Sequence, residues 1–184
     1  MKRFLISAGV QLVVLPCFLL GADAERAEAA ERVAEFKTAA LSREEGAGAQ
    51  QVQARQLVDL ASELRGRRYL FAGERKENYL KAGDAEMMAG DLESAAVGNL
   101  DKAAQNWLSL AEASRSVGNE EGRRTALISC EDARGKARDG CKRALEAYER
   151  AVQDYGPENG ADEKKAAAAA ERVAALREQV DARR

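Results

Sequence analysis

The chain has 184 residues, enough for one domain of ordinary size, and its 29 basic residues nearly balance 31 acidic ones, which gives no electrostatic reason to expect nucleic-acid binding. About a fifth of the residues are alanine and 33% are charged, against 5% aromatic, so helix is favoured almost everywhere around a thin, elongated core. Histidine is absent, which excludes histidine-based acid–base catalysis, nucleophiles activated by histidine and most zinc sites.

Residues 1–24 are typical of a secretory signal peptide. Two basic residues precede an apolar run over 4–20, and small residues occupy the positions that a signal peptidase reads before a cut between Ala24 and Glu25. The run holds about 17 residues and is interrupted by a glutamine and a proline, so it is short for the roughly 20 residues that a spanning helix needs. We therefore expect a cleaved signal and a periplasmic or secreted protein.

Two alternatives to cleavage stay open for this segment. One is an uncleaved membrane anchor. The other is a lipoprotein anchored through Cys17, although Pro16 stands where a lipobox has a small residue. Membrane attachment is expected only if the signal segment or Cys17 is retained.

Residues 25–50 are predicted to form an N-terminal helix and a linker. Apolar residues recur over 25–41 at intervals of four, three and four, which is a narrow amphipathic seam: Ala29, Val33, Phe36 and Ala40. Over 42–50, the run Gly46-Ala47-Gly48 indicates a turn or linker.

A helix is predicted next over 51–72, opening a helical domain over 51–157. Its end carries the basic cluster Arg65-Gly66-Arg67-Arg68, followed by Tyr69-Leu70-Phe71. The cluster suits contact with an anionic lipid headgroup or polyanion, and it equally suits a solvated edge.

Residues 74–97 contain Ala-Gly-Asp twice, at 82–84 and 89–91. The two glycines either let one helix pack closely against a neighbour or mark real breaks, because an interior glycine costs a helix about 1 kcal/mol relative to alanine. We favour one helix here over two.

The remaining domain is predicted to consist of short helices separated by turns. Turns are expected at Gly98-Asn99, at Gly118-Asn119 as a left-handed cap, and at Asp139-Gly140. The helices between and after these turns cover about 100–117, 120–137 and 141–155, and the glycine- and proline-containing run over 156–160 ends the last one.

The region over 158–184 is predicted to hold a C-terminal helix at 162–182. Its apolar residues again recur at four, three and four: Ala169, Val173, Leu176 and Val180. The six residues at 169–174 repeat those at 29–34, so the two seams suit pairing with each other or with copies in a second chain.

The segments 98–110 and 139–157 resemble the second helix of a tetratricopeptide repeat. Each has a glycine-containing turn, a small alanine and an aromatic residue four positions later, and the second ends in proline. The resemblance implies these packing residues: Gly98, Ala103, Trp107, Gly140, Ala144, Tyr148, Ala151 and Pro157. It also implies a curved stack of helical hairpins whose concave face holds a peptide or partner domain, as in degenerate repeats of bacterial cell-envelope proteins.

Cys130 and Cys141 would remain after signal cleavage. In an oxidising compartment such a pair suggests a disulfide, but a continuous helix between them would hold their Cα atoms on the order of 14 Å apart, too far for a bridge. A bridge and two buried free thiols both stay open.

Together these features predict an all-α protein of stacked antiparallel helical hairpins, a short tetratricopeptide-like solenoid with amphipathic terminal helices. No catalytic, cofactor-binding or metal-binding residues are expected, so we predict a non-enzymatic scaffold or adaptor that binds protein partners. The alternative is a coiled-coil oligomer or periplasmic chaperone, in which the terminal seams associate between chains.

Overall fold

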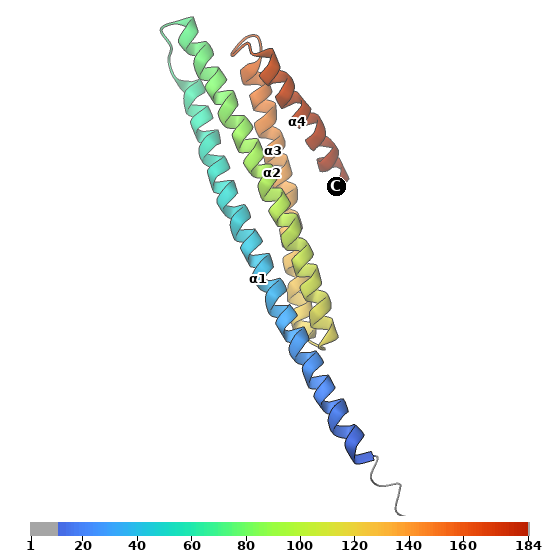
Figure 1. Cartoon of the computed structure of the whole chain (residues 1–184). Helices are drawn as coiled ribbons and strands as arrows, with labels where there is room; N and C mark the ends of the chain where they lie inside the picture. The colour runs from blue at the N-terminus through green and yellow to red at the C-terminus, as the bar shows by residue number, and fades with distance from the viewer. Residues whose placement is uncertain (1–10, 184) are drawn as a thin grey trace, which may run out of the picture.

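A computed structural model describes the backbone of residues 11–183 and the side chains of 27–183. Within this range the fold is all-α, as predicted, with four helices and no strand: α1 (Gln11–Gly66), α2 (Ala72–Ser116), α3 (Glu120–Tyr155) and α4 (Glu163–Ala182). Long α2 packs antiparallel along both α1 and α3, and the shorter α4 lies along α3, so the helices form a rod (Figure 1).

The predicted signal peptide and its cleavage site between Ala24 and Glu25 lie outside the described side chains, as does Cys17. They therefore stay predictions. In the part of the chain that the structure describes, no helix combines the length and the apolar character needed to cross a bilayer.

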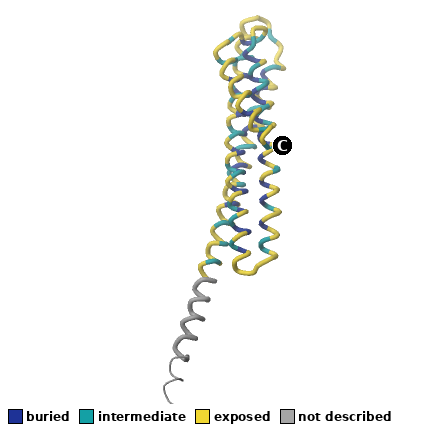
Figure 2. The backbone as a smooth tube through the Cα atoms, turned by 90° about the vertical axis from the view of Figure 1, so that its right-hand side faces the viewer, coloured by how far each residue is buried: buried dark blue, intermediate teal, exposed yellow. Residues whose placement is uncertain are grey.

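Small residues form the surfaces along which the long helices meet. Figure 2 shows the buried positions as a strip along the inner side of each helix. On α3 the buried residues recur at alternating intervals of four and three: Ala126, Cys130, Ala133, Ala137, Gly140, Ala144, Ala147, Ala151 and Asp154. On α1 a buried alanine recurs every seven residues: Ala40, Ala47, Ala54 and Ala61. This heptad spacing of small side chains lets antiparallel helices approach closely, and it makes the core a thin row.

Three predicted interruptions are wrong. α1 continues through the expected linker over 42–50, and α2 and α3 continue unbroken through Gly98-Asn99 and Asp139-Gly140. Isolated glycines cost each helix about 1 kcal/mol, but the heptads on both sides bury enough apolar surface to outweigh this cost. Consequently 74–97 is part of one helix, and α1 ends at Gly66 rather than at residue 72.

Two predicted breaks are confirmed. Gly118 has φ +73°, its N–H donates to the Arg115 carbonyl, and the Asn119 N–H donates to the Ser114 carbonyl. This pair of bonds is a Schellman motif, which satisfies the last carbonyls of α2. The second break lies between Tyr155, where α3 ends, and Glu163, where α4 begins.

The tetratricopeptide-like segments therefore lie inside long helices and do not begin short hairpins. The first is in the second half of α2, and the second is in the second half of α3 and its following loop. A stack of short hairpins is not formed at these positions, and the resemblance itself stays a prediction from sequence.

The two matching terminal seams pack within the chain and not against each other. Val33 and Phe36 of α1 contact the buried cluster around Trp107. Val173 and Leu176 of α4 contact the cluster around Tyr148, which lies on α3. Each seam is thus already covered by α2 and α3.

Alanine substitutions distinguish helical glycines from the turn glycine. Nothing lies within 4 Å of a Cβ added at Gly98, whereas Gly118 has the left-handed φ that an L-residue adopts at a cost. We expect Gly98→Ala to raise the free energy of unfolding by about 1 kcal/mol and Gly118→Ala to lower it by about 1 kcal/mol. Urea denaturation followed by circular dichroism measures both. A loss of stability in Gly98→Ala would contradict the unbroken α2.

Candidate functional site

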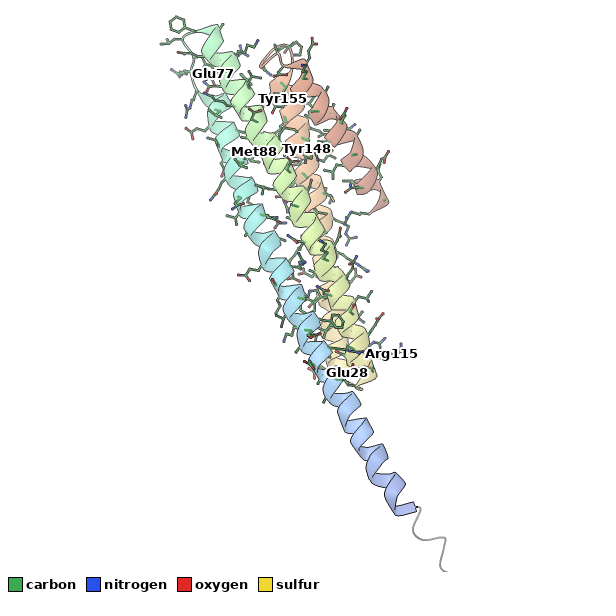
Figure 3. All side chains as sticks on the ribbon, in the orientation of Figure 1. Glu28, Glu77, Met88, Arg115, Tyr148 and Tyr155 are labelled. Atoms are coloured by element: carbon green, nitrogen blue, oxygen red, sulfur yellow. The ribbon has the colours of Figure 1, made fainter. Side chains whose placement is uncertain are left out.

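Two tyrosines of α3 stack on two glycines of α2. A Cβ built on Gly83 would lie 2.5 Å from the Tyr155 ring, and one built on Gly90 would lie 2.5 Å from the Tyr148 ring. Both distances are far below van der Waals contact, so only glycine fits. The repeated Ala-Gly-Asp sequence therefore marks close helix packing, one of the two readings that the sequence left open, and Figure 3 shows both tyrosines where α3 and α2 run side by side.

The aspartate after each glycine accepts a hydrogen bond from the same tyrosine. The hydroxyl of Tyr155 donates to Asp84 at 2.7 Å, and that of Tyr148 donates to Asp91 at 2.7 Å. Burial, and then the aspartate, raises the pKa of Tyr148 to about 12 and raises the pKa of Tyr155 further in the same direction. Both phenols are thus neutral hydrogen-bond donors at physiological pH, not nucleophiles.

A buried ion-pair network joins α1, α2 and α3 near the same end of the rod. Arg65 of α1 donates to both carboxylate oxygens of Asp154, with Nε–Oδ1 2.9 Å and Nη2–Oδ2 2.7 Å, and to Glu86 at 2.7 Å. Glu86 is fully buried and Asp154 is 3% exposed. The hydrogen bonds to Asp154 raise the pKa of Arg65 most, with burial opposing them, so the guanidinium stays charged.

A third arginine joins Glu86, and the same chemistry recurs one heptad along α2 and α3. Arg150 Nε donates to Glu86 at 3.0 Å, and Arg143 donates to Glu93 through Nε at 2.8 Å and Nη2 at 3.0 Å. Hydrogen bonding to Glu93 raises the pKa of Arg143. The three acids and three arginines bind one another, and among the described residues Glu86 Oε2 is a buried side-chain atom with no hydrogen-bond partner. These ion pairs hold the helices in register, a known use of buried polar groups in coiled coils.

The space between α1 and α3 is spanned by charged side chains. A cavity of about 260 Å³ opens there over a floor of Ala54, Ala89 and Ala147, with Arg55, Asp59 and Glu146 among its lining residues. Among the described residues, no group of three histidine, cysteine, aspartate or glutamate side chains is placed to hold a metal ion.

Salt bridges attach α4 to the face shared by α2 and α3. Lys165 pairs with Asp84 at 2.6 Å near the start of α4. At its end, Arg183 donates to both oxygens of Asp101, at 2.8 and 2.6 Å. Between these points Leu176 is buried against Tyr148, so α4 is a firmly packed fourth helix over that length.

α4 ends part-way along α3, and the face it occupies continues beyond it with no covering helix among the described residues (Figure 1). A cavity of about 360 Å³ lies at this end, lined by residues that include Asp101, Arg134 and Arg183. One heptad further on, Leu108 follows Asp101 on α2 and Leu127 precedes Arg134 on α3, and each leucine is 39% exposed. We call this uncovered part, with Leu108 and Leu127, the open face.

The predicted packing residues divide into two groups. Buried residues are Ala103, Trp107, Gly140, Ala144, Tyr148 and Ala151, whereas Gly98 and Pro157 are exposed. Trp107 donates its Nε1 hydrogen to Glu44 at 2.6 Å and lies in the core. A Cβ at Gly140 would meet Val97 at 2.8 Å, so this glycine serves close packing and not the predicted turn.

Cys130 and Cys141 are buried free thiols on one helix. Eleven residues of continuous helix separate them by roughly 16 Å, which is too far for the disulfide that one reading allowed. Burial raises the pKa of Cys141, which keeps the thiol protonated.

The ion-pair residues were missed in the sequence, although a signal for them was present. Ala82, Glu86, Ala89, Glu93 and Ala96 alternate at four and three, so both glutamates fall on a heptad seam. A charged residue on such a seam predicts a buried partner on a facing helix. Which arginine supplies it depends on the antiparallel register, which local spacing does not contain.

No family model, no curated protein and no solved structure matches this chain.

Proposed function

We propose that the protein is a non-enzymatic helical scaffold or adaptor that binds a protein partner, in the periplasm or outside the cell. The observation that carries the proposal is the open face. α4 demonstrates that an amphipathic helix packs on the face shared by α2 and α3, and the same face continues past Arg183 with two half-exposed leucines. An amphipathic helix of a partner fits this continuation.

The ion-pair network also supports a scaffold. The buried acids and arginines bind one another in a network that holds three helices in register, so they contribute to a rigid helical bundle. The extracellular or periplasmic location rests on the predicted signal peptide alone.

The alternative, an oligomeric coiled coil or chaperone, is less well supported, because the surfaces it needs between chains are engaged within one chain. It requires the seams around Val33 and Val173 to pair between chains, and both are packed against α2 and α3 of the same chain. Size-exclusion chromatography with light scattering separates the two proposals, because the scaffold predicts a monomer and the alternative an oligomer.

Residue-specific photocrosslinking tests the scaffold proposal directly. A photoreactive phenylalanine analogue placed at Leu127 in cells should give a discrete crosslinked protein, whereas the same group at Ile128 should not. Ile128 is the adjacent residue and is 63% exposed, so it controls for mere accessibility. We expect Leu108→Glu combined with Leu127→Glu to weaken capture of that protein about tenfold or more.

Equal crosslinking at 127 and 128 would argue against a partner on the open face. Helicity of each variant, measured by circular dichroism, should match the parent chain because both leucines are partly exposed.

A further inference from the structure

The loop over 67–71, between α1 and α2, exposes two adjacent large apolar residues. Leu70 is 89% exposed and Phe71 is 69% exposed, the highest values among the described large hydrophobic side chains. Tyr69, beside them, donates its hydroxyl hydrogen to the Leu64 carbonyl and so turns back onto α1. The loop forms one end of the rod, which Glu77 marks in Figure 3, while Glu28 and Arg115 mark the other end.

Phe71 breaks a local rule of helix formation. It is the N-cap of α2, with extended backbone (φ −128°, ψ 143°), and makes no side-chain capping hydrogen bond. Serine, threonine, aspartate or asparagine at this position would typically stabilise the helix by about 1 kcal/mol. An exposed aromatic residue that provides no capping hydrogen bond is better explained by a function than by helix stability.

Charges of both signs surround the loop, with Glu74 in the first turn of α2 and three cations that have no acidic partner in the part of the chain that the structure describes. Arg67 pairs with Glu63, but Arg68, Arg75 and Lys76 take part in no salt bridge within the described residues, Arg75 instead lying over the Tyr79 ring. Arg75 and Lys76 also lie near the N-terminus of α2, where the helix dipole disfavours cations. Arg65 does not belong to this surface, because the ion-pair network holds it in the bundle.

We propose that this end of the rod binds an anionic lipid bilayer, with Leu70 and Phe71 entering the interface and Arg68, Arg75 and Lys76 contacting lipid phosphates. Two adjacent apolar side chains on a projecting loop fit a soft lipid surface, and unpaired cations around them supply the complementary charge. An aromatic ring with long basic side chains is the combination that settles at a membrane–water interface.

A tryptophan placed at the loop reports insertion. The chain has one native tryptophan, Trp107, which is buried and remote from the loop, so it gives a constant background. In full-length Phe71→Trp, we expect the emission to shift to shorter wavelength and resist aqueous quenchers with vesicles that contain phosphatidylglycerol, and neither change with phosphatidylcholine alone. Adding Leu70→Ser should weaken vesicle partitioning about tenfold.

Ile128→Trp is the matched control, because Ile128 is similarly exposed but lies far from the loop. If the N-terminal segment alone anchored the chain, vesicles would bind but position 71 would show no shift, which would overturn the proposal. Equal shifts at 71 and 128, equal shifts with both lipids, or a shift at 71 only with a protein partner would also overturn it. Replacing Arg68 and Lys76 with glutamine, or raising the salt concentration, should weaken the shift. The scaffold proposal concerns the open face and this proposal concerns the loop over 67–71, so either proposal can fail while the other stands.

Discussion

Replacing Gly83 and Gly90 together with alanine should lower the free energy of unfolding by about 4 kcal/mol. Each new Cβ would lie 2.5 Å from a tyrosine ring that is buried and held by its hydroxyl at an aspartate, so the ring cannot simply move aside. Overpacking of this kind costs about 3 kcal/mol at the upper end, and alanine returns about 1 kcal/mol of helix propensity, which leaves about 2 kcal/mol per site. Urea denaturation of the single and double variants measures this loss.

Whether each glycine-to-alanine substitution stabilises or destabilises the protein depends on the tyrosine ring opposite it. In a Tyr148→Leu background the ring is gone, so Gly90→Ala should become neutral or stabilising by up to about 1 kcal/mol. Gly98→Ala is the internal control in the same helix, since nothing lies near its added Cβ. A loss at Gly90 that persists without the tyrosine ring would contradict the stacking of Tyr148 on Gly90.

The helical class and several ends were predictable because they depend on local chemistry. Alanine and charged residues favour helix, Gly118-Asn119 forms a left-handed cap, and the loop before Glu163 contains a proline and two glycines. These signals act within a few residues, so the sequence contains them directly.

The break at 140 was mispredicted because glycine has two uses that look alike in one sequence. Gly118 supplies a positive φ, whereas Gly140 supplies space for Val97 of the facing helix. The second use depends on which residue lies opposite, a tertiary fact that local pattern does not carry. The seven-residue repeat of Gly83 and Gly90 was the better guide, because turns do not recur at a heptad spacing and helix contacts do.

Arg65→Met should lower the free energy of unfolding by about 3 kcal/mol. Among the described residues, Arg65 donates every side-chain hydrogen bond that Asp154 accepts, and Asp154 is nearly inaccessible to water. Removing one partner of a buried pair leaves an uncompensated charge, which costs about 3–5 kcal/mol, and the partial exposure of Arg65 places it at the lower end. Glu86 loses less, because Arg150 still binds it.

Two further variants distinguish the effect of the buried network on stability from the effect of a surface ion pair. Arg67→Met removes a pair with Glu63 in which both side chains are more than half exposed, so it should change stability by under about 1 kcal/mol. Adding Asp154→Asn to Arg65→Met should restore part of the loss, because it removes the buried charge while keeping the side-chain shape. Arg65 lies two positions before the exposed loop, so its bonds to α2 and α3 also fix how α1 presents Leu70 and Phe71. If Arg65→Met and Arg67→Met cost the same, the network does not hold α1 in place.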